Sequence, residues 1–421
     1  MSNQTKQWGA IIIMIALFAM IAFVTNLCTP MATIIKNQGE ISNVLAQIGN
    51  YGNFIAYLVM GIPAGMLIAK YGYKKTALIG LLVGITGILI QWYSGQLDAQ
   101  ANLGLVFGVY LVGALITGLC MCILNCVVNP MLNLLGGGGN KGNQLIQIGG
   151  VFNSSAAVAC YILMGALIAD ASKAKIADAT PALMIALAIF VIAFVIILFT
   201  KIEEPEQAPV QLDLIKGAMS HKHFALGTLG IFLYMGIEVG VPNFVQQYLI
   251  EERNIPAATV GMLVAVYWFM MLIGRFVGAS IGDKVSSRAM ITTVSCATMV
   301  LVLFGMFAPT DVLVSFPGVD WGKLEMIWQP VPVGIFSFLL VGLCTSVMWG
   351  AIFNMAVEGL GKYTAIASGI FMTMVFGCAV MMFIQATVAD MTDYITSFWV
   401  VVFCAAYLLY YAQVGSKIAK K

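Results

Sequence analysis

Asn26-Leu-Cys-Thr-Pro30 and Glu238-Val-Gly-Val-Pro242 are the two stretches of this chain that decide its fold. Each lies inside a long apolar run, and each places a polar residue four positions before a proline. Their polar residues stand 212 positions apart in a chain of 421 residues. A proline inside a helix removes a backbone hydrogen bond and bends the helix. The pair therefore indicates a duplicated unit, with a bent helix at the same place in each copy.

Two further matches extend this repeat. Gly65 through Lys75 falls on Gly278 through Arg288 at an offset of 213, and Asn129 through Gly136 falls on Asn354 through Gly361 at an offset of 225. A longer loop at 308–330 in the second copy accounts for the larger offset of the last match. Together the matches predict two parallel repeats of six helices. In transporters built this way, the substrate binds near the membrane midplane between the repeats.

The composition is that of a membrane protein, because 61% of the residues are hydrophobic and only 9% are charged. The mean hydropathy is +0.96, which excludes a soluble domain. A helix needs roughly 20 apolar residues to cross about 30 Å of hydrocarbon. We therefore predict an all-α membrane protein with twelve transmembrane helices, near 8–35, 44–69, 75–95, 102–134, 143–169, 181–200, 223–249, 257–282, 287–307, 331–360, 363–389 and 394–415.

The one long polar interruption near the middle, from Thr200 to Lys222, divides the chain. We expect an N-terminal six-helix bundle at 1–200, a cytoplasmic linker at 201–222 and a C-terminal six-helix bundle at 223–421. Lys and Arg accumulate in cytoplasmic loops. With both termini inside, fifteen of the twenty basic residues fall on the cytoplasmic side; the exceptions are Lys36, Lys173, Lys175, Arg253 and Lys323.

Glu238 is the lone carboxylate deep inside an apolar helix. Such a group costs roughly 2.5 to 3.5 kcal/mol on insertion scales, so it usually faces a wet cavity and serves a function there. Burial also disfavours the charged form of a carboxyl group. We interpret the chain as a transporter and Glu238 as its candidate proton-coupling residue. The alternative is that Pro30 and Pro242 only curve two core helices.

Amide side chains supply the candidate substrate site. Asn125, Asn129 and Asn133 recur every four residues and share one face of a helix. Amides both donate and accept hydrogen bonds, as the hydroxyls of an uncharged polyol require. The alternative is that they join neighbouring helices, at about 0.6 kcal/mol each. The full candidate set adds aromatic residues that can stack on a sugar ring, and comprises Asn26, Asn125, Asn129, Asn153, Tyr234, Asn243, Gln246, Gln247, Tyr267, Trp268, Trp349 and Asn354.

Other classes of site find little support. All nine cysteines lie in apolar spans and are expected to be core residues, while His221 and His223 stand at a helix edge, so no metal site is predicted. Arg275 is the only basic residue within a span, which argues against phosphorylated substrates, since these need a buried cationic clamp. We see no mid-span His or Ser-base pair and expect no enzyme, no cofactor and no binding of nucleic acid.

Two groups of motifs carry a family resemblance. The segment Gly65 to Lys75 resembles the loop between helices 2 and 3 of the major facilitator superfamily. Asn129-Pro130, Val151-Phe-Asn-Ser154, Tyr234-Met-Gly-Ile-Glu-Val-Gly240 and Ile273-Gly-Arg-Phe-Val-Gly278 resemble the fucose/galactose/glucose proton symporter family within it. The resemblance implies a bacterial inner-membrane protein that imports a neutral monosaccharide with protons. We expect it to act in the lipid bilayer as a monomer.

Two departures from that family bear on coupling. Its fucose-transporting member carries an Asp four residues before the helix 1 proline and a Glu four residues before the helix 4 Asn-Pro. Both residues are linked to proton coupling in that family. This chain has Asn26 and Asn125 there, whereas the helix 5 asparagine is kept as Asn153. Either Glu238 carries the proton, or the protein is a facilitator, or it is sodium-coupled. A multidrug exporter of the same fold and a membrane-embedded sensor are the alternative functions.

Overall fold

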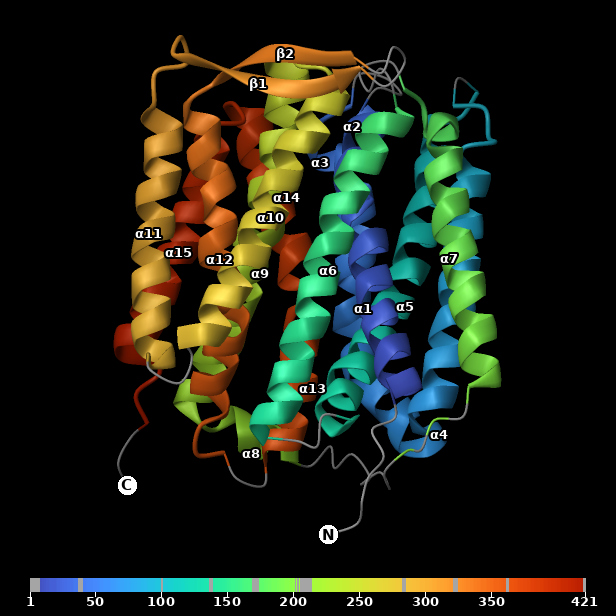
Figure 1. Ribbon diagram of the computed structural model, residues 1–421, viewed down its shortest axis with the longest axis vertical. Helices are drawn as coiled ribbons and strands as arrows, with labels where there is room; N and C mark the ends of the chain where they lie inside the picture. Colours follow the sequence, from blue (N-terminus) through green and yellow to red (C-terminus); the bar gives the residue numbers. More distant parts are fainter. Residues whose placement is uncertain are drawn as a thin grey trace.

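The computed structural model describes residues 8–36, 41–99, 101–135, 139–168, 174–200, 202, 204, 214–281, 285–320, 325–360 and 363–418. Long helices stand side by side and form one bundle (Figure 1). A two-stranded sheet lies across one end of the bundle, which we call the hairpin end. The opposite end, where the first helix begins and the last one ends, we call the termini end.

The first half of the chain supplies the helices of one side of the bundle. α1 (Trp8–Asn26) and α2 (Cys28–Lys36) together make one span, which is interrupted at Leu27. A short α3 follows, and then the long helices. These elements are α3 (Asn43–Ala46), α4 (Ile48–Ser94), α5 (Leu103–Leu135), α6 (Gly139–Leu167), the 3-10 turn η1 (Ile176–Ala179) and α7 (Thr180–Phe199).

The second half repeats this layout. The first elements are α8 (Leu214–Met219), α9 (Lys222–Gln247), the π-helical turn η2 (Tyr248–Glu252), α10 (Ala257–Ile281) and α11 (Ser287–Phe307). After the sheet come α12 (Gly334–Val357), α13 (Thr364–Met374), α14 (Gly377–Met391), the 3-10 turn η4 (Thr396–Phe398), α15 (Trp399–Tyr410) and the π-helical turn η5 (Tyr411–Gly415). α9 continues through Pro242 without interruption. Of the two bends predicted at Pro30 and Pro242, the one in the first copy therefore coincides with a break between helices, and the one in the second copy does not.

α4 is 47 residues long and contains two of the predicted spans. Its helical backbone is broken at Gly72, where φ is +81°, a conformation that glycine adopts without strain. The Glu204 carboxylate accepts hydrogen bonds from the backbone N–H groups of Tyr73 and Lys74, at 2.7 and 2.8 Å, and so holds the corner. The described residues contain eleven helices long and apolar enough to cross a membrane, and counting α4 twice gives the predicted twelve. The fold class is thereby confirmed.

The sheet at the hairpin end was not predicted. β1 (Leu313–Asp320) pairs with β2 (Glu325–Pro332) in antiparallel register, with Leu313 opposite Pro332. The sequence analysis placed a loop there and began the next span at 331, but α12 begins at Gly334. In a two-stranded sheet every strand is an edge strand, where the prolines of this segment are tolerated.

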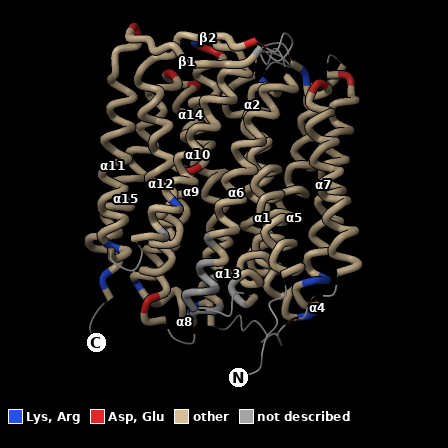
Figure 2. Tube along the Cα trace, in the orientation of Figure 1, with Lys and Arg blue, Asp and Glu red and all other residues tan. Residues whose placement is uncertain are grey.

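Charged residues gather at the two ends of the bundle and leave its middle almost bare, as expected of helices that cross a membrane (Figure 2). The structure describes all nine cysteines as free thiols and shows no cluster of metal-ligating side chains among the described residues. Cys296 is a correction to the sequence analysis, because it is exposed and not in the core. It lies on α11, of which only Ile291, Ser295, Thr298, Val302 and Gly305 are buried.

The two halves meet along two seams, where α6 packs on α10 and α4 packs on α13 and α14. Small residues allow close approach of helices in membranes. A Cβ added at Gly261 on α10 would lie 2.5 Å from the backbone oxygen of Tyr161 on α6, and one at Gly165 would lie 3.0 Å from the Cα of Ala258. The backbones of α6 and α10 therefore touch near the hairpin end. α8 lies within the expected linker, of which residues 201, 203 and 205–213 are outside the described residues.

Candidate functional site

Glu238 lies near the middle of its membrane span, which runs from Lys222 to Glu252. The residue is only partly buried. Tyr234 stands one helical turn away on the same face, and Arg275 on α10 lies near enough for its charge to act on the carboxyl group. A carboxyl group in this setting has a phenol and a cation as its polar neighbours. Both are groups that stabilise a carboxylate once its proton has left.

A cluster of hydroxyl groups ties α9 to α10 and α12 beside Glu238. The Tyr267 hydroxyl donates to the backbone oxygen of Glu238 at 3.0 Å and lies 3.2 Å from the Oγ1 of Thr345. The Tyr234 hydroxyl donates to the backbone oxygen of Thr345 at 3.4 Å. The ring of Trp349 meets that of Tyr234 edge to face, with centroids 6.2 Å apart. Four of the predicted site residues thus come together around the middle of α9.

Trp268 connects this cluster to the first half of the chain. Its ring stacks on that of Tyr161 from α6, with centroids 6.3 Å apart and planes inclined by 22°. The Trp268 Nε1 and the Tyr161 hydroxyl are both buried, and the Tyr161 hydroxyl lies near Thr29 as well as Trp268. Polar groups of the two halves therefore face one another at this contact.

The predicted amides of the first half are all engaged with their own helices or neighbours. Asn26 donates to the backbone oxygen of Ala22 at 2.8 Å, and Asn129 donates to that of Asn125 at 3.1 Å. Asn125 donates to the hydroxyl of Tyr57 at 2.9 Å. The oxygen of each amide keeps acceptor capacity beyond these bonds. The predicted stripe on α5 is present at two positions; the side chain of Asn133 lies outside the described residues.

Asn153 lies at the middle of α6 and is half-buried. Its Nδ2 donates to the backbone oxygen of Phe18 on α1 at 2.9 Å. One N–H of the amide therefore joins two helices of the first half, while the second N–H and the oxygen have no protein partner within the part of the chain that the structure describes.

The three predicted polar residues at the end of α9 form a separate group nearer the hairpin end. Asn243 and Gln247 are fully buried and hydrogen-bond to each other, and Asn243 also bonds Gln47 of the first half. Gln246 instead lines a small cavity between the halves, together with Pro30, Ile34 and Tyr161.

Asn354 is not brought to the middle of the bundle. It lies three residues before the end of α12, at the termini end, and is exposed. There it lines a cavity of about 380 Å³ with Arg288, Glu358 and Ser416. Its repeat counterpart, Asn129, lies at the same end of α5, so the repeat is reproduced but Asn354 is remote from Glu238.

Comparison with known proteins agrees with this architecture. The family model described as Major Facilitator Superfamily matches residues 10–383. The chain belongs to the major facilitator superfamily. Its members are membrane transporters, which confirms a transporter rather than an enzyme and the twelve-helix fold expected from the repeat.

Two curated relatives of this major facilitator chain carry sugar names. One is a glucose/galactose transporter of Brucella abortus biovar 1, 27% identical over 99% of this chain and 96% of its own length. The other is the L-fucose-proton symporter of Escherichia coli K12, 20% identical over 96% of this chain and 92% of its own. The crystal structure of FucP in the outward conformation matches with a TM-score of 0.68 at 19% identity, over 97% and 98% of the two chains. At that identity the likeness shows the fold.

Several residues of the site escaped the sequence analysis. Tyr57, Tyr161 and Thr345 each contact a predicted site residue, and Gln47 pairs with Asn243. A mid-span tyrosine carries a hydroxyl group that needs a partner, so Tyr57 and Tyr161 offered a signal in the sequence. Thr345 and Gln47 offered none, because their roles depend on how neighbouring helices are rotated.

Proposed function

We propose that this protein imports a neutral monosaccharide by alternating access, with proton symport through Glu238. In this proposal both termini lie in the cytoplasm, which the distribution of basic residues supports, and the hairpin end faces outward; the bacterial inner membrane is what the family resemblance implies. In this proposal the two six-helix bundles, 1–200 and 223–421, rock about a site in the middle of the bundle, as parallel-repeat transporters do.

The observation that carries this proposal is the set of uncharged polar groups around one carboxyl group. Tyr267, Thr345 and Tyr234 surround the middle of α9, and Asn153 and Tyr161 stand in the other half. Hydroxyls and amides that donate and accept match the hydroxyls of a sugar, and the tryptophan and tyrosine rings match its apolar face. The sugar names of the curated relatives support the same substrate class.

The experiment that tests the proposal is counterflow into proteoliposomes. We expect the purified protein to catalyse saturable exchange of at least one labelled hexose or related sugar from a panel of monosaccharides, and unlabelled sugar to compete. A panel without exchange or competition, combined with uptake of lipophilic cations, would instead assign the protein as a multidrug exporter.

Coupling needs its own measurement, because Asn26 and Asn125 stand where the fucose-transporting member of the resembling family carries acids. This departure leaves two alternatives to proton symport, namely a facilitator and a sodium-coupled carrier. Accumulation under an inward proton gradient, compared with an inward sodium gradient and with no gradient, distinguishes the three. We expect accumulation with the proton gradient alone.

Asn153→Ala is expected to weaken sugar binding roughly five-fold, about 1 kcal/mol, the ordinary value of one lost hydrogen bond. The loss is modest because one N–H of the amide is already engaged with Phe18. Binding is measured by tryptophan fluorescence or calorimetry on the purified protein. Ser155→Ala is the matched control, since the one partner of the exposed Ser155 among the described residues is the Val151 oxygen of its own helix. Equal affinity of both variants would make Asn153 a packing residue.

A further inference from the structure

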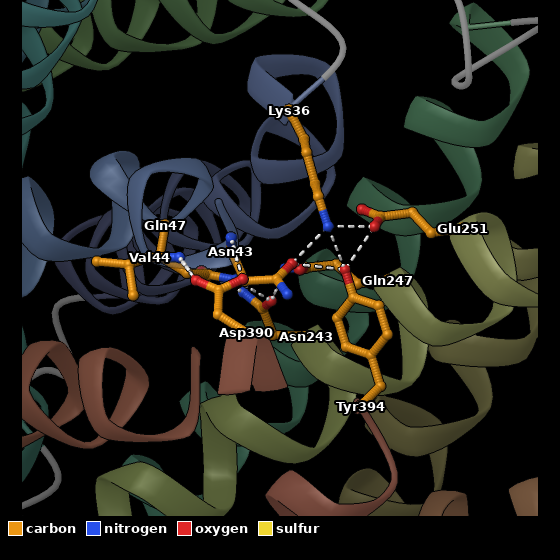
Figure 3. Close-up of polar contacts among 9 residues, drawn as sticks. All are labelled: Lys36, Asn43, Val44, Gln47, Asn243, Gln247, Glu251, Asp390 and Tyr394. Carbon is orange, nitrogen blue, oxygen red and sulfur yellow. Dashed lines mark hydrogen bonds and ion pairs between the residues drawn. The ribbon is translucent and has the colours of Figure 1, made fainter. Parts of the chain in front are cut away.

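Lys36 is one of the few basic residues that the sequence places on the outward side, and the structure gives it three partners at the hairpin end. Its Nζ forms an ion pair with the Glu251 carboxylate. It also donates to the Oδ1 of Asn43 at 2.6 Å and to the hydroxyl of Tyr394 at 2.7 Å (Figure 3). Lys36 and Asn43 belong to the first half, whereas Glu251 and Tyr394 belong to the second. The lysine therefore joins the two halves.

Tyr394 and Asp390 add further bonds across the same seam. The Tyr394 hydroxyl donates to the Oδ1 of Asn43 at 2.6 Å and also contacts Glu251. Burial, with the charge of Glu251 beside it, raises the pKa of the Tyr394 phenol, which keeps its proton available for donation. The Asp390 carboxylate accepts from the backbone N–H groups of Asn43 and Val44, at 2.7 and 3.0 Å.

A layer of amides lies one helical turn deeper. The Nε2 of Gln47 donates to the Oδ1 of Asn243 at 2.8 Å, and the Nδ2 of Asn243 donates back to the Oε1 of Gln47 at 3.1 Å. Gln247 adds a donor to the same Asn243 oxygen at 2.6 Å. Figure 3 shows both layers between the ribbons of the two halves. Gln247 and Glu251 stand four residues apart, so the two layers are continuous along α9 and η2.

We propose that Lys36, Asn43, Glu251, Asp390 and Tyr394 form an outer latch that holds the hairpin end shut and is broken each time the site opens there. This rests on the alternating access proposed above. Separation of the halves must part the ion pair and expose the amide layer beneath it. The outer latch is thereby a determinant of how the protein divides its time between states open to the two sides of the membrane.

The latch is built to be reversible. The side chains of Lys36 and Glu251 keep 22% and 21% of their surface exposed, so water screens the pair. The second carboxylate oxygen of Glu251 is buried and has no protein partner among the described residues. Desolvation offsets much of the attraction in such a pair. A latch of this kind biases an equilibrium without locking it.

Thiol labelling from outside the membrane tests the latch. Ile34 is fully buried and lines the small cavity between the halves, together with Gln246 and Ile250. Ile34→Cys therefore becomes reachable by a membrane-impermeant maleimide only when the hairpin end opens. The protein without this substitution reports the background from the native cysteines. We expect Lys36→Gln and Glu251→Gln each to raise the labelling rate about five-fold, the effect of losing one partly exposed ion pair with its hydrogen bonds.

A charge reversal and a matched control complete the test. Lys36→Glu combined with Glu251→Lys is expected to restore slow labelling, because the ion pair can form in the opposite sense. Arg253→Gln is the control, since Arg253 lies at the same end but bonds the Thr310 oxygen within its own half at 3.3 Å; its labelling rate should equal that of the parent. Asp390→Asn provides a second single variant should a Lys36 variant fold poorly.

Unchanged labelling in the Lys36, Glu251 and Asp390 variants would overturn the latch, as would an equal rise in Arg253→Gln. The labelling rate needs no sugar and no gradient. A protein that exchanges no sugar but shows the predicted pattern of labelling would therefore refute the proposed substrate and keep the latch. A protein that exchanges sugar without that pattern of labelling would refute the latch and keep the proposed substrate.

Discussion

Replacing Glu238 by glutamine is expected to abolish sugar accumulation driven by an inward proton gradient and to leave sugar counterflow largely intact. Glutamine has the shape of the protonated acid but cannot release a proton. Counterflow exchanges sugar for sugar and needs no net proton movement. Glu238 stands near the middle of its span and is only partly buried, a position at which the proposed cycle would expose the same carboxyl group to each side in turn.

The measurement is uptake of labelled sugar into proteoliposomes, with and without a proton gradient, beside counterflow in the same preparation. Asp311→Asn is the control, because Asp311 is an exposed carboxylate in the loop before β1; both activities should survive there. Wild-type protein that never accumulates sugar under the gradient contradicts proton coupling. A glutamine variant that loses binding as well would make Glu238 a ligand of the sugar.

The fold was predictable from the sequence because two coarse signals specify it. Apolar runs of membrane length gave the spans, and the matched segments around Pro30 and Pro242 gave the two copies. The long α4 illustrates this, because its helical backbone is broken at Gly72, between the two spans that the apolar runs predicted. The hairpin escaped because it lies outside the membrane, where neither signal applies.

The site was predictable only in part. The residues around the middle of α9, Tyr234, Tyr267 and Trp349, do gather beside Glu238. Asn243 and Gln247, in contrast, bond Gln47 of the other half and belong to the closure of the hairpin end. In spans that are apolar all round, periodicity does not tell which face meets which neighbour. Sequence reasoning could thus name polar residues and their depth but not their partners.

The second large effect is expected from a substitution in the seam between α6 and α10. Gly261→Val is expected to reduce sugar exchange at least about five-fold, because a Cβ at this position would lie 2.5 Å from the backbone oxygen of Tyr161. The contact involves backbone, so the helices themselves must move apart near the hairpin end. Overpacking of this kind costs about 1 to 3 kcal/mol, which shifts an equilibrium between closed and open states by a factor of roughly 5 to 150.

Exchange requires the hairpin end to close in every cycle, and a protein held open there binds sugar without carrying it across. The expected pattern for Gly261→Val is therefore retained sugar binding, faster labelling of a cysteine at Ile34, and exchange at about a fifth of the parent rate or less. Gly108→Val is the matched control, since nothing lies within 4 Å of a Cβ added there. Loss of binding together with exchange would point to misfolding, and undiminished exchange would show that α6 and α10 need not touch for the cycle to proceed.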